Sequence, residues 1–179
     1  EKVAEALGDG DPNEVLAELE NIPVRRQDMA TLKPGQELND EVINYFMKLL
    51  ARREESKATP PSCAFMQTNF YSVLAEGFGG YNYNAVANWT RGTKRTKSTD
   101  VFSKDLIIIP IHGYRHWTLA VINMKQKRFE YFDSLQNEPG MVLNNLRRWL
   151  EDEALDKQKN FDTSGWPEVV WKKECPRQK

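Results

Sequence analysis

Both histidines of the chain, His112 and His116, lie in the segment IIIPIHGYRHWTLAVINMKQKRFEYFDSLQ, which spans residues 107–136. Asp133 follows an aromatic-rich run near the end of the same segment. An imidazole and a carboxylate can act as a general base and its partner, in which the carboxylate accepts the Nδ1 proton and stabilises the imidazolium. The same pair can also be purely structural. Which of these applies depends on the elements that carry the residues.

A predicted hairpin places His116 and Asp133. The runs WTLAVIN (117–123) and RFEYF (128–132) are rich in β-branched and aromatic residues, which favours strands. The residues MKQKR predict the turn that joins them. Antiparallel pairing brings the start of one strand and the end of the next to the same edge of the sheet. We therefore expect His116 and Asp133 to lie close together.

The two histidines could alternatively bind a metal, since ligands at i and i+4 share one face of a helix. Pro110 and Gly113 bracket His112, however, and predicted strands flank both histidines. No helical face is therefore expected there. We interpret His112 as a packing or loop-capping residue, and we expect neither a metal nor a cofactor.

Helices are predicted before and after the strands. Residues 39–54 carry apolar side chains at three- and four-residue spacing, acidic residues in the first turn and arginines in the last. Further helices are predicted over 141–155, over 13–20 and, as two short ones, within 63–92. The near-continuous LIIIPI (106–111) predicts a strand that is buried on both faces. This order of elements is typical of an α+β (mixed α/β) domain.

Composition disfavours several classes of partner. The chain has 179 residues, 25 basic and 26 acidic side chains and a net charge of −1, so no overall field attracts nucleic acid or anionic lipid. No apolar run reaches the roughly 18 residues of a membrane helix. The basic segment 91–99 is interpreted as a solvated loop, with docking of an acidic partner as the alternative. We expect a soluble intracellular monomer that binds neither nucleic acid nor membrane.

Three segments together resemble the SUMO-specific cysteine proteases, also called sentrin-specific or ubiquitin-like-protein-specific proteases. They are LNDEVINYFMKLL (38–50), IIIPIHGYRHWTLAVINMKQKRFEYFDSL (107–135) and FDTSGWPEVVWKKECPRQK (161–179). The resemblance implies a papain-like fold with a central, mostly antiparallel sheet flanked by helices. It also implies a thiol protease that cleaves after the C-terminal Gly-Gly of SUMO, in precursors and in isopeptide conjugates. Residues 1–23 would be an acidic spacer with a short helix, and residues 24–179 the catalytic domain without its C-terminal part.

The resemblance also implies roles for particular residues. His116 would be the general base and Asp133 its orienting partner, and the side-chain amide of Gln178 would help to form the oxyanion hole. Trp117 would roof a tunnel for the diglycine, which only glycines are thin enough to pass. Asp40 would contact a basic side chain of SUMO.

The sequence departs from the family pattern in two places. The family often has tryptophan immediately before Leu-Asn-Asp, as a second wall of the tunnel, and Glu37 stands there instead. The family's nucleophilic cysteine follows the glutamine in a Gln-x-Asn-Gly-x-Asp-Cys-Gly pattern, so we expect it beyond Lys179. Cys175 precedes Gln178 and opens no helix that would lower the pKa of its thiol. Neither Cys175 nor Cys63 is expected to replace the nucleophile.

Two other functions remain open on the sequence. The chain could be a non-catalytic module that holds a ubiquitin-like protein through the surface around Asp40 and Trp117. It could also be a protease for another ubiquitin-like modifier, an alternative that Glu37 leaves open. The resemblance further implies a location in the nucleus or at the nuclear envelope.

Overall fold

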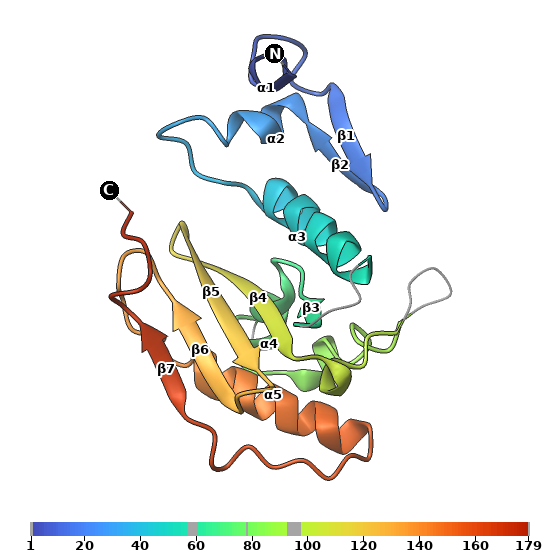
Figure 1. Cartoon of the computed structure of the whole chain (residues 1–179), viewed down its shortest axis with the longest axis vertical. Helices are drawn as coiled ribbons and strands as arrows, with labels where there is room; N and C mark the ends of the chain where they lie inside the picture. Colours follow the sequence, from blue (N-terminus) through green and yellow to red (C-terminus); the bar gives the residue numbers. More distant parts are fainter. Residues whose placement is uncertain (1, 57–60, 78, 93–97, 179) are drawn as a thin grey trace. The chain divides into compact units, whose positions relative to one another are not determined.

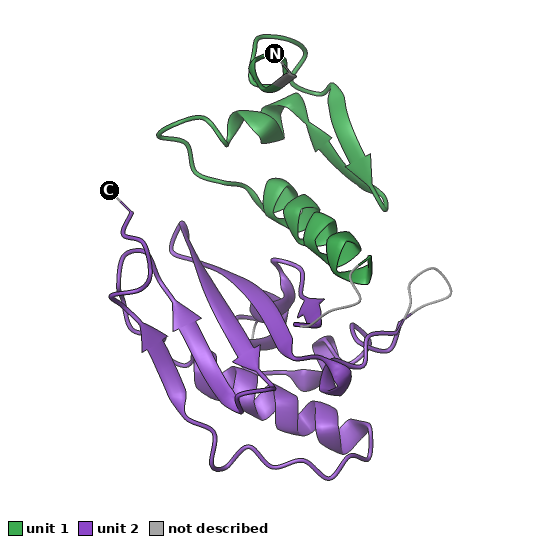
Figure 2. Cartoon of the chain, viewed as in Figure 1, with its two compact units in different colours: residues 1–58 green, residues 59–179 purple. Residues whose placement is uncertain are grey.

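The computed structural model describes residues 2–56, 61–77, 79–92 and 98–178. The chain divides into two compact units, unit 1 (residues 1–58) and unit 2 (residues 59–179) (Figure 2). His116 and Asp133 belong to unit 2, whereas Asp40 belongs to unit 1.

Unit 1 contains a β-hairpin and three helices. Its elements are α1 (Lys2–Ala6), β1 (Val15–Leu19), β2 (Ile22–Arg25), α2 (Arg26–Ala30) and α3 (Asp40–Glu55). The helix predicted over residues 13–20 is wrong, because β1 occupies most of that segment and pairs antiparallel with β2. The segment has some helical propensity, but pairing with β2, which buries Val24, outweighs this weak local preference.

The predicted helix over residues 39–54 is confirmed as α3. The side chain of Asn39 caps it by accepting a hydrogen bond from the Val42 backbone N–H at 3.1 Å. Helix α3 contacts both strands of the hairpin in unit 1. None of its side chains is fully buried within the described structure, and Phe46 and Leu49 remain 54% and 42% exposed.

Unit 2 contains a five-stranded sheet in the order β3-β4-β5-β6-β7 (Figure 1). The strands are β3 (Cys63–Phe65), β4 (Leu106–Gly113), β5 (His116–Asn123), β6 (Arg128–Phe132) and β7 (Glu168–Trp171). The two central pairings are antiparallel, and β3–β4 and β6–β7 are parallel. The sheet is therefore mixed, with its longest ladders, in the centre, antiparallel. The outer strands are parallel because long crossovers return the chain to add each of them in that direction.

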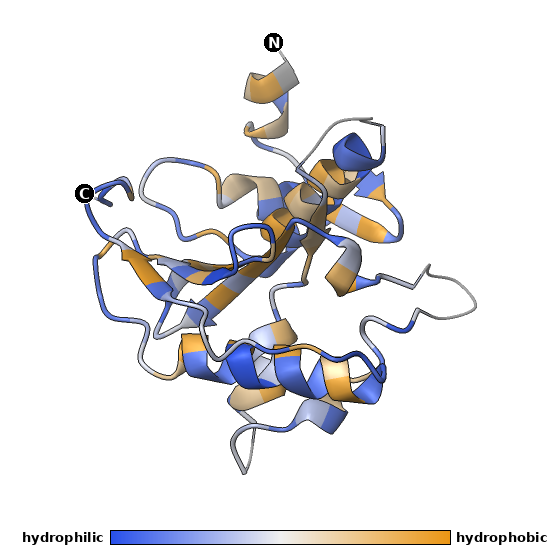
Figure 3. Cartoon of the chain, turned by 60° about the horizontal axis from the view of Figure 1, so that its bottom comes forward, coloured by the Kyte–Doolittle hydropathy of each residue, from blue (hydrophilic) through white to orange (hydrophobic). Residues whose placement is uncertain are grey.

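Helices α4 (Phe70–Ala75) and α5 (Val142–Asp156) pack on this sheet and on each other. Two single-turn 3₁₀ helices, η1 (Tyr83–Ala85) and η2 (Val101–Ser103), lie between α4 and β4 in the chain. Phe70 of α4 meets Trp149 of α5 edge to face, with ring centroids 5.0 Å apart. Hydrophobic and hydrophilic residues alternate along α5 (Figure 3), as expected for a helix with one buried face. The predicted helix over residues 141–155 is confirmed.

The stability of unit 2 should depend on the buried face of α5. Leu146 is 0% exposed, so we expect Leu146→Ala to lower the free energy of unfolding by about 2–5 kcal/mol through lost burial and a residual cavity. Leu155, on the same helix, is 77% exposed, and Leu155→Ala should change that energy by only about 0.5 kcal/mol. Urea denaturation of both variants measures the difference. Equal costs would contradict the packing described here.

The structure bears in part on two expectations about partners: that the chain does not span a membrane, and that the basic segment 91–99 is a solvated loop. Within the described residues, no helix is long and apolar enough to span a membrane. Of the basic segment, residues 93–97 lie outside the described structure. Arg91, at its start, pairs with Asp156 of α5 at 2.5 Å.

Candidate active site

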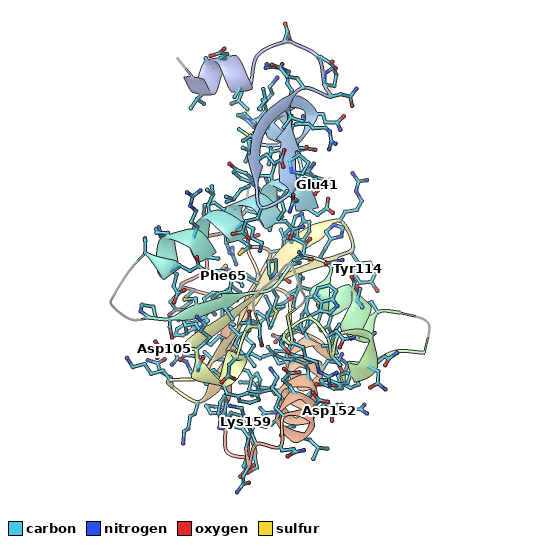
Figure 4. The ribbon with its side chains drawn as sticks, turned by 90° about the vertical axis from the view of Figure 1, so that its right-hand side faces the viewer. Glu41, Phe65, Asp105, Tyr114, Asp152 and Lys159 are labelled. Carbon is cyan, nitrogen blue, oxygen red and sulfur yellow. The ribbon has the colours of Figure 1, made fainter. Side chains whose placement is uncertain are left out.

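A tight turn between β4 and β5 positions His116. The strands pair up to Gly113 and His116, which leaves Tyr114 and Arg115 as a two-residue turn. Both turn residues have positive φ, 50° and 61°, the geometry of a type I′ hairpin, which usually carries Asn-Gly. The labelled Tyr114 projects from the tip of this hairpin (Figure 4) and is fully exposed. His116 is therefore the first residue of β5, directly beside a rigid turn.

The structure brings His116 and Asp133 together. Strand β6 pairs antiparallel with β5 and ends at Phe132, so Asp133 follows at the edge where β5 begins. His116 Nε2 lies 2.6 Å from Asp133 Oδ1, and the two side chains are 16% and 2% exposed. The sequence-based expectation that Nδ1 faces the carboxylate is wrong, because the ring orientation depends on packing that a strand pattern does not specify. Nδ1 is thus the nitrogen available to exchange a proton with a reacting group.

The carboxylate of Asp133 organises the turn that follows it. Oδ1 also accepts from the backbone N–H of Leu135 at 2.7 Å, and Oδ2 accepts from that of Asn137 at 3.1 Å. Burial raises the pKa of Asp133, but hydrogen bonds from His116, Leu135 and Asn137 outweigh it and hold that pKa below its usual value. The carboxyl is therefore ionised at neutral pH and can stabilise an imidazolium.

Acid should weaken the folded state through Asp133. Its pKa is lower in the folded protein than the ~3.9 of an unfolded aspartate, so the carboxylate stabilises the fold above that value. This contribution is lost as the pH falls through the lowered folded pKa. We expect the stability difference between wild type and Asp133→Asn to shrink between about pH 7 and about pH 3 in urea denaturation. A difference that widened in acid would contradict this sign.

Gln178 lies beside the same turn, although it is 44 positions from Ser134 in the sequence. Its backbone N–H donates to the Ser134 carbonyl oxygen at 3.2 Å, and the Ser134 hydroxyl donates to Gln178 Oε1 at 3.2 Å. Ser134 is the residue after Asp133. Asp133 therefore contacts His116, and Ser134, the next residue of the same turn, contacts the Gln178 amide.

Trp117 packs against His112 across the β4–β5 ladder, with ring centroids 4.5 Å apart. Cross-strand partners share a face of the sheet and successive residues alternate between faces. Because His116 is the partner of Gly113, the imidazoles of His112 and His116 project from opposite faces of the hairpin. This arrangement gives the two histidines no shared metal position. His112 packs on Trp117, as expected.

The family follows from comparison with known proteins. The Ulp1 protease family, C-terminal catalytic domain, matches residues 36–179. The chain belongs to this family. Ubiquitin-like-specific protease 1A of Arabidopsis thaliana is 40% identical over 148 residues, which cover 82% of this chain and 29% of the relative. A sentrin-specific protease of Caenorhabditis elegans is 35% identical over 178 residues, which cover 98% of this chain and 24% of the relative. This chain thus spans less than a third of these two relatives.

Solved structures of the Ulp1 family share the fold. The C-terminal Ulp1 protease domain in complex with Smt3, the yeast ortholog of SUMO, matches with a TM-score of 0.77 and 28% identity. The match covers 99% of this chain and 73% of that domain. A SUMO protease Ulp1 whose catalytic cysteine is oxidized to a sulfonic acid matches with the same TM-score and 26% identity. The predicted α+β fold and the predicted resemblance to SUMO-specific proteases are confirmed.

Cys63 lies far from the turn between β4 and β5 that carries His116. It pairs with Leu106 at the start of β4, seven residues before Gly113. At about 3.3 Å per residue, that separation along the strand is roughly 23 Å. Figure 4 shows the two labelled ends, Asp105 and Tyr114, well separated. Cys175 is half-buried in the irregular segment before Gln178 and begins no helix.

The two substrate-contact residues suggested by the Ulp1-family resemblance in unit 1 lie before and at the start of α3. Asp40 is the first residue of α3 and is exposed, and Glu37 is also exposed. Burial, followed by the negative charges of Asp40 and Asp28, raises the pKa of Glu41. Asp40 and Glu41 thus place two carboxyl groups in the first turn of α3.

Sequence reasoning missed the residues that support the His116–Asp133 pair. Leu135 and Asn137 donate their backbone N–H groups to Asp133, and Ser134 binds Gln178. A signal for the turn was present, since an aspartate that caps its own following backbone is typical of an Asx turn. No local signal predicted the contact between Ser134 and Gln178.

Proposed function

We propose that this chain supplies the catalytic domain of a cysteine protease that cleaves after the C-terminal diglycine of SUMO. The substrates would be SUMO precursors and isopeptide conjugates. The observation that carries the proposal is the 2.6 Å pair of His116 Nε2 and Asp133 Oδ1, with Gln178 on the adjacent turn residue, in a Ulp1-family fold. The nucleophile would be a cysteine on the C-terminal side of Gln178 in the full-length protein.

The acid–base chemistry follows from the orientation of His116. The thiol gives its proton to Nδ1, and the thiolate attacks the carbonyl carbon of the last glycine. The imidazolium, stabilised by Asp133, then returns the proton to the leaving amine as the carbon–nitrogen bond breaks. Water, deprotonated by the same imidazole, hydrolyses the resulting thioester and restores the thiol. No metal or cofactor takes part in these steps.

Gln178 would stabilise the charge that develops on the carbonyl oxygen. The Oε1 end of its amide already accepts from Ser134, so the Nε2 end is the donor that can face an oxyanion. Trp117 follows His116 in β5 and packs on His112 on the opposite face of the hairpin from His116, where it offers a flat indole. Such a surface suits the thin diglycine segment of a ubiquitin-like protein.

A covalent probe tests the proposal directly. The full-length protein is incubated with SUMO that ends in a C-terminal vinyl sulfone, and the adduct is mapped by mass spectrometry. We expect one adduct at a cysteine other than Cys63 and Cys175, and unchanged labelling of a protein in which both are replaced by alanine. No adduct, with tight binding of SUMO retained, would instead favour a non-catalytic binding module.

The choice of modifier is tested by a second probe. Glu37 places an exposed carboxylate where the family often has tryptophan, which could alter acceptance of the modifier. The full-length protein is labelled in parallel with SUMO and with ubiquitin, each ending in a C-terminal vinyl sulfone. We expect SUMO to react much faster, and faster labelling by ubiquitin would favour another modifier.

We also propose a nuclear or nuclear-envelope location, supported only by family membership. Fluorescence microscopy of the tagged full-length protein would test it.

A further inference from the structure

Ser134 contacts Gln178 at two points, and neither contact was assigned a role by the sequence. The Ser134 carbonyl accepts from the Gln178 backbone N–H, and the Ser134 hydroxyl donates to Gln178 Oε1, each at 3.2 Å. Both the backbone and the side chain of Gln178 are therefore located by a single residue.

The hydroxyl contact engages the acceptor end of the Gln178 amide. A glutamine amide has an acceptor end, Oε1, and a donor end, Nε2. An amide that presents Oε1 to a developing oxyanion would repel it, whereas one that presents Nε2 would stabilise it. In the structure the Ser134 hydroxyl donates to Oε1, and this arrangement leaves Nε2 as the outward donor.

Hydrogen bonds of the residues before and after Ser134 hold the turn that carries it. On one side, Asp133 accepts from the backbone N–H groups of Leu135 and Asn137. On the other, Gln136 Nε2 donates to the Lys172 carbonyl oxygen at 2.9 Å and Gln136 Oε1 accepts from Arg177 at 2.6 Å. These bonds hold the chain segment before Gln178 against the turn. Ser134 is thus presented by a rigid support.

We propose that Ser134 is a positioning residue that orients the Gln178 amide toward the oxyanion and couples it to the His116–Asp133 pair through one turn. The inference rests on the proposed function. In it, Asp133 orients the imidazole while the next residue along the chain orients the oxyanion donor. Ser134 itself touches no reacting atom.

The test compares Ser134→Ala and Gln178→Ala in the full-length protein acting on a SUMO precursor. Loss of one oxyanion donor costs about 10²–10³-fold in kcat, so Gln178→Ala should fall in that range, and Ser134→Ala, which only frees the amide to rotate, by about tenfold. KM should stay unchanged in both. The double variant should be no slower than Gln178→Ala alone, because the hydroxyl acts only through that amide.

Two further variants separate positioning from a structural effect. Ser134→Thr keeps the hydroxyl and should restore kcat. Ser103→Ala removes a turn hydroxyl that donates to a backbone oxygen elsewhere, at Asp100, and should leave kcat unchanged. A SUMO aldehyde, whose thiol adduct places an oxygen in the oxyanion hole, should inhibit Ser134→Ala about tenfold less well, while binding of cleaved SUMO is unchanged.

The outcomes distinguish this inference from the proposed function. If wild type does not cleave SUMO precursors, the proposed function fails. If wild type is active and Ser134→Ala matches it, or if the losses from Ser134→Ala and Gln178→Ala multiply in the double variant, the positioning role is overturned. Equal weakening of aldehyde and product binding would overturn it as well.

Discussion

His116→Ala is expected to abolish turnover of a SUMO precursor by the full-length protein, with a fall in kcat of at least about 10³-fold. The imidazole both takes the thiol proton and supplies the proton that the leaving amine needs, so no step of the proposed reaction proceeds efficiently without it. His116 is half-buried at the start of β5 and is not part of the buried core of unit 2. Folding should therefore survive the change. Single-turnover cleavage, followed by gel, measures the loss.

Binding and a matched histidine provide the controls for His116→Ala. Calorimetry with SUMO should give an affinity close to that of wild type, because the substitution removes chemistry and leaves the docking surface in place. His112→Ala removes the other histidine of the same hairpin, which packs on Trp117 on the face opposite to His116. We expect it to raise KM more than it lowers kcat. A His116→Ala protein with undiminished turnover would exclude His116 as the general base.

Asp133→Asn is expected to lower kcat by about 10²–10⁴-fold, the second largest effect. All the hydrogen bonds that Asp133 makes to His116, Leu135 and Asn137 are accepted ones, shared between two carboxylate oxygens. An asparagine has one acceptor oxygen, so its NH₂ group would face an N–H donor or the imidazole. The ring would lose its orientation, and the imidazolium would lose its counter-charge. The pH profile of kcat/KM and the imidazole NMR signals of His116 would report both changes.

Asp162→Asn is the matched control for this change. Asp162 also caps a turn, since Oδ1 accepts from the Ser164 backbone N–H at 2.8 Å and Oδ2 from the Ser164 hydroxyl at 2.9 Å. The hydroxyl can rotate to accept from an asparagine NH₂ group, so this turn should tolerate the change. We expect turnover within about twofold of wild type, as for most surface substitutions. A similar loss at both positions would mean that turn disruption, and not the link to His116, explains Asp133→Asn.

Both large effects arise from one edge of the sheet in unit 2. The type I′ turn at Tyr114 and Arg115 fixes where β5 begins, and the end of β6 fixes Asp133. The backbone around His116 is therefore set by strand pairing, which is more rigid than a long loop. Gln178, from a distant part of the chain, lies at the same edge and is hydrogen-bonded to Ser134.

Much of this edge was predictable because its determinants are local. The β-branched and aromatic content of two short runs indicated β5 and β6, and a short hairpin leaves few ways to pair them. The proximity of His116 and Asp133 followed from antiparallel geometry alone. Helix α3 was equally clear from its spacing and its charged ends. In contrast, residues 15–19 were mistaken for helix because pairing with β2 overrode their propensity.

The sequence by itself determined β4, β5 and β6, helices α3 and α5 and the hairpin that brings His116 to Asp133, since each depends on residues close in the chain. Only the tertiary structure decided that Nε2 faces the carboxylate, because a ring orientation depends on side-chain packing. It also decided the parallel outer strands β3 and β7 and the contact of Ser134 with Gln178 across 44 positions. These features depend on how the crossovers and α5 pack, and no local periodicity encodes that packing.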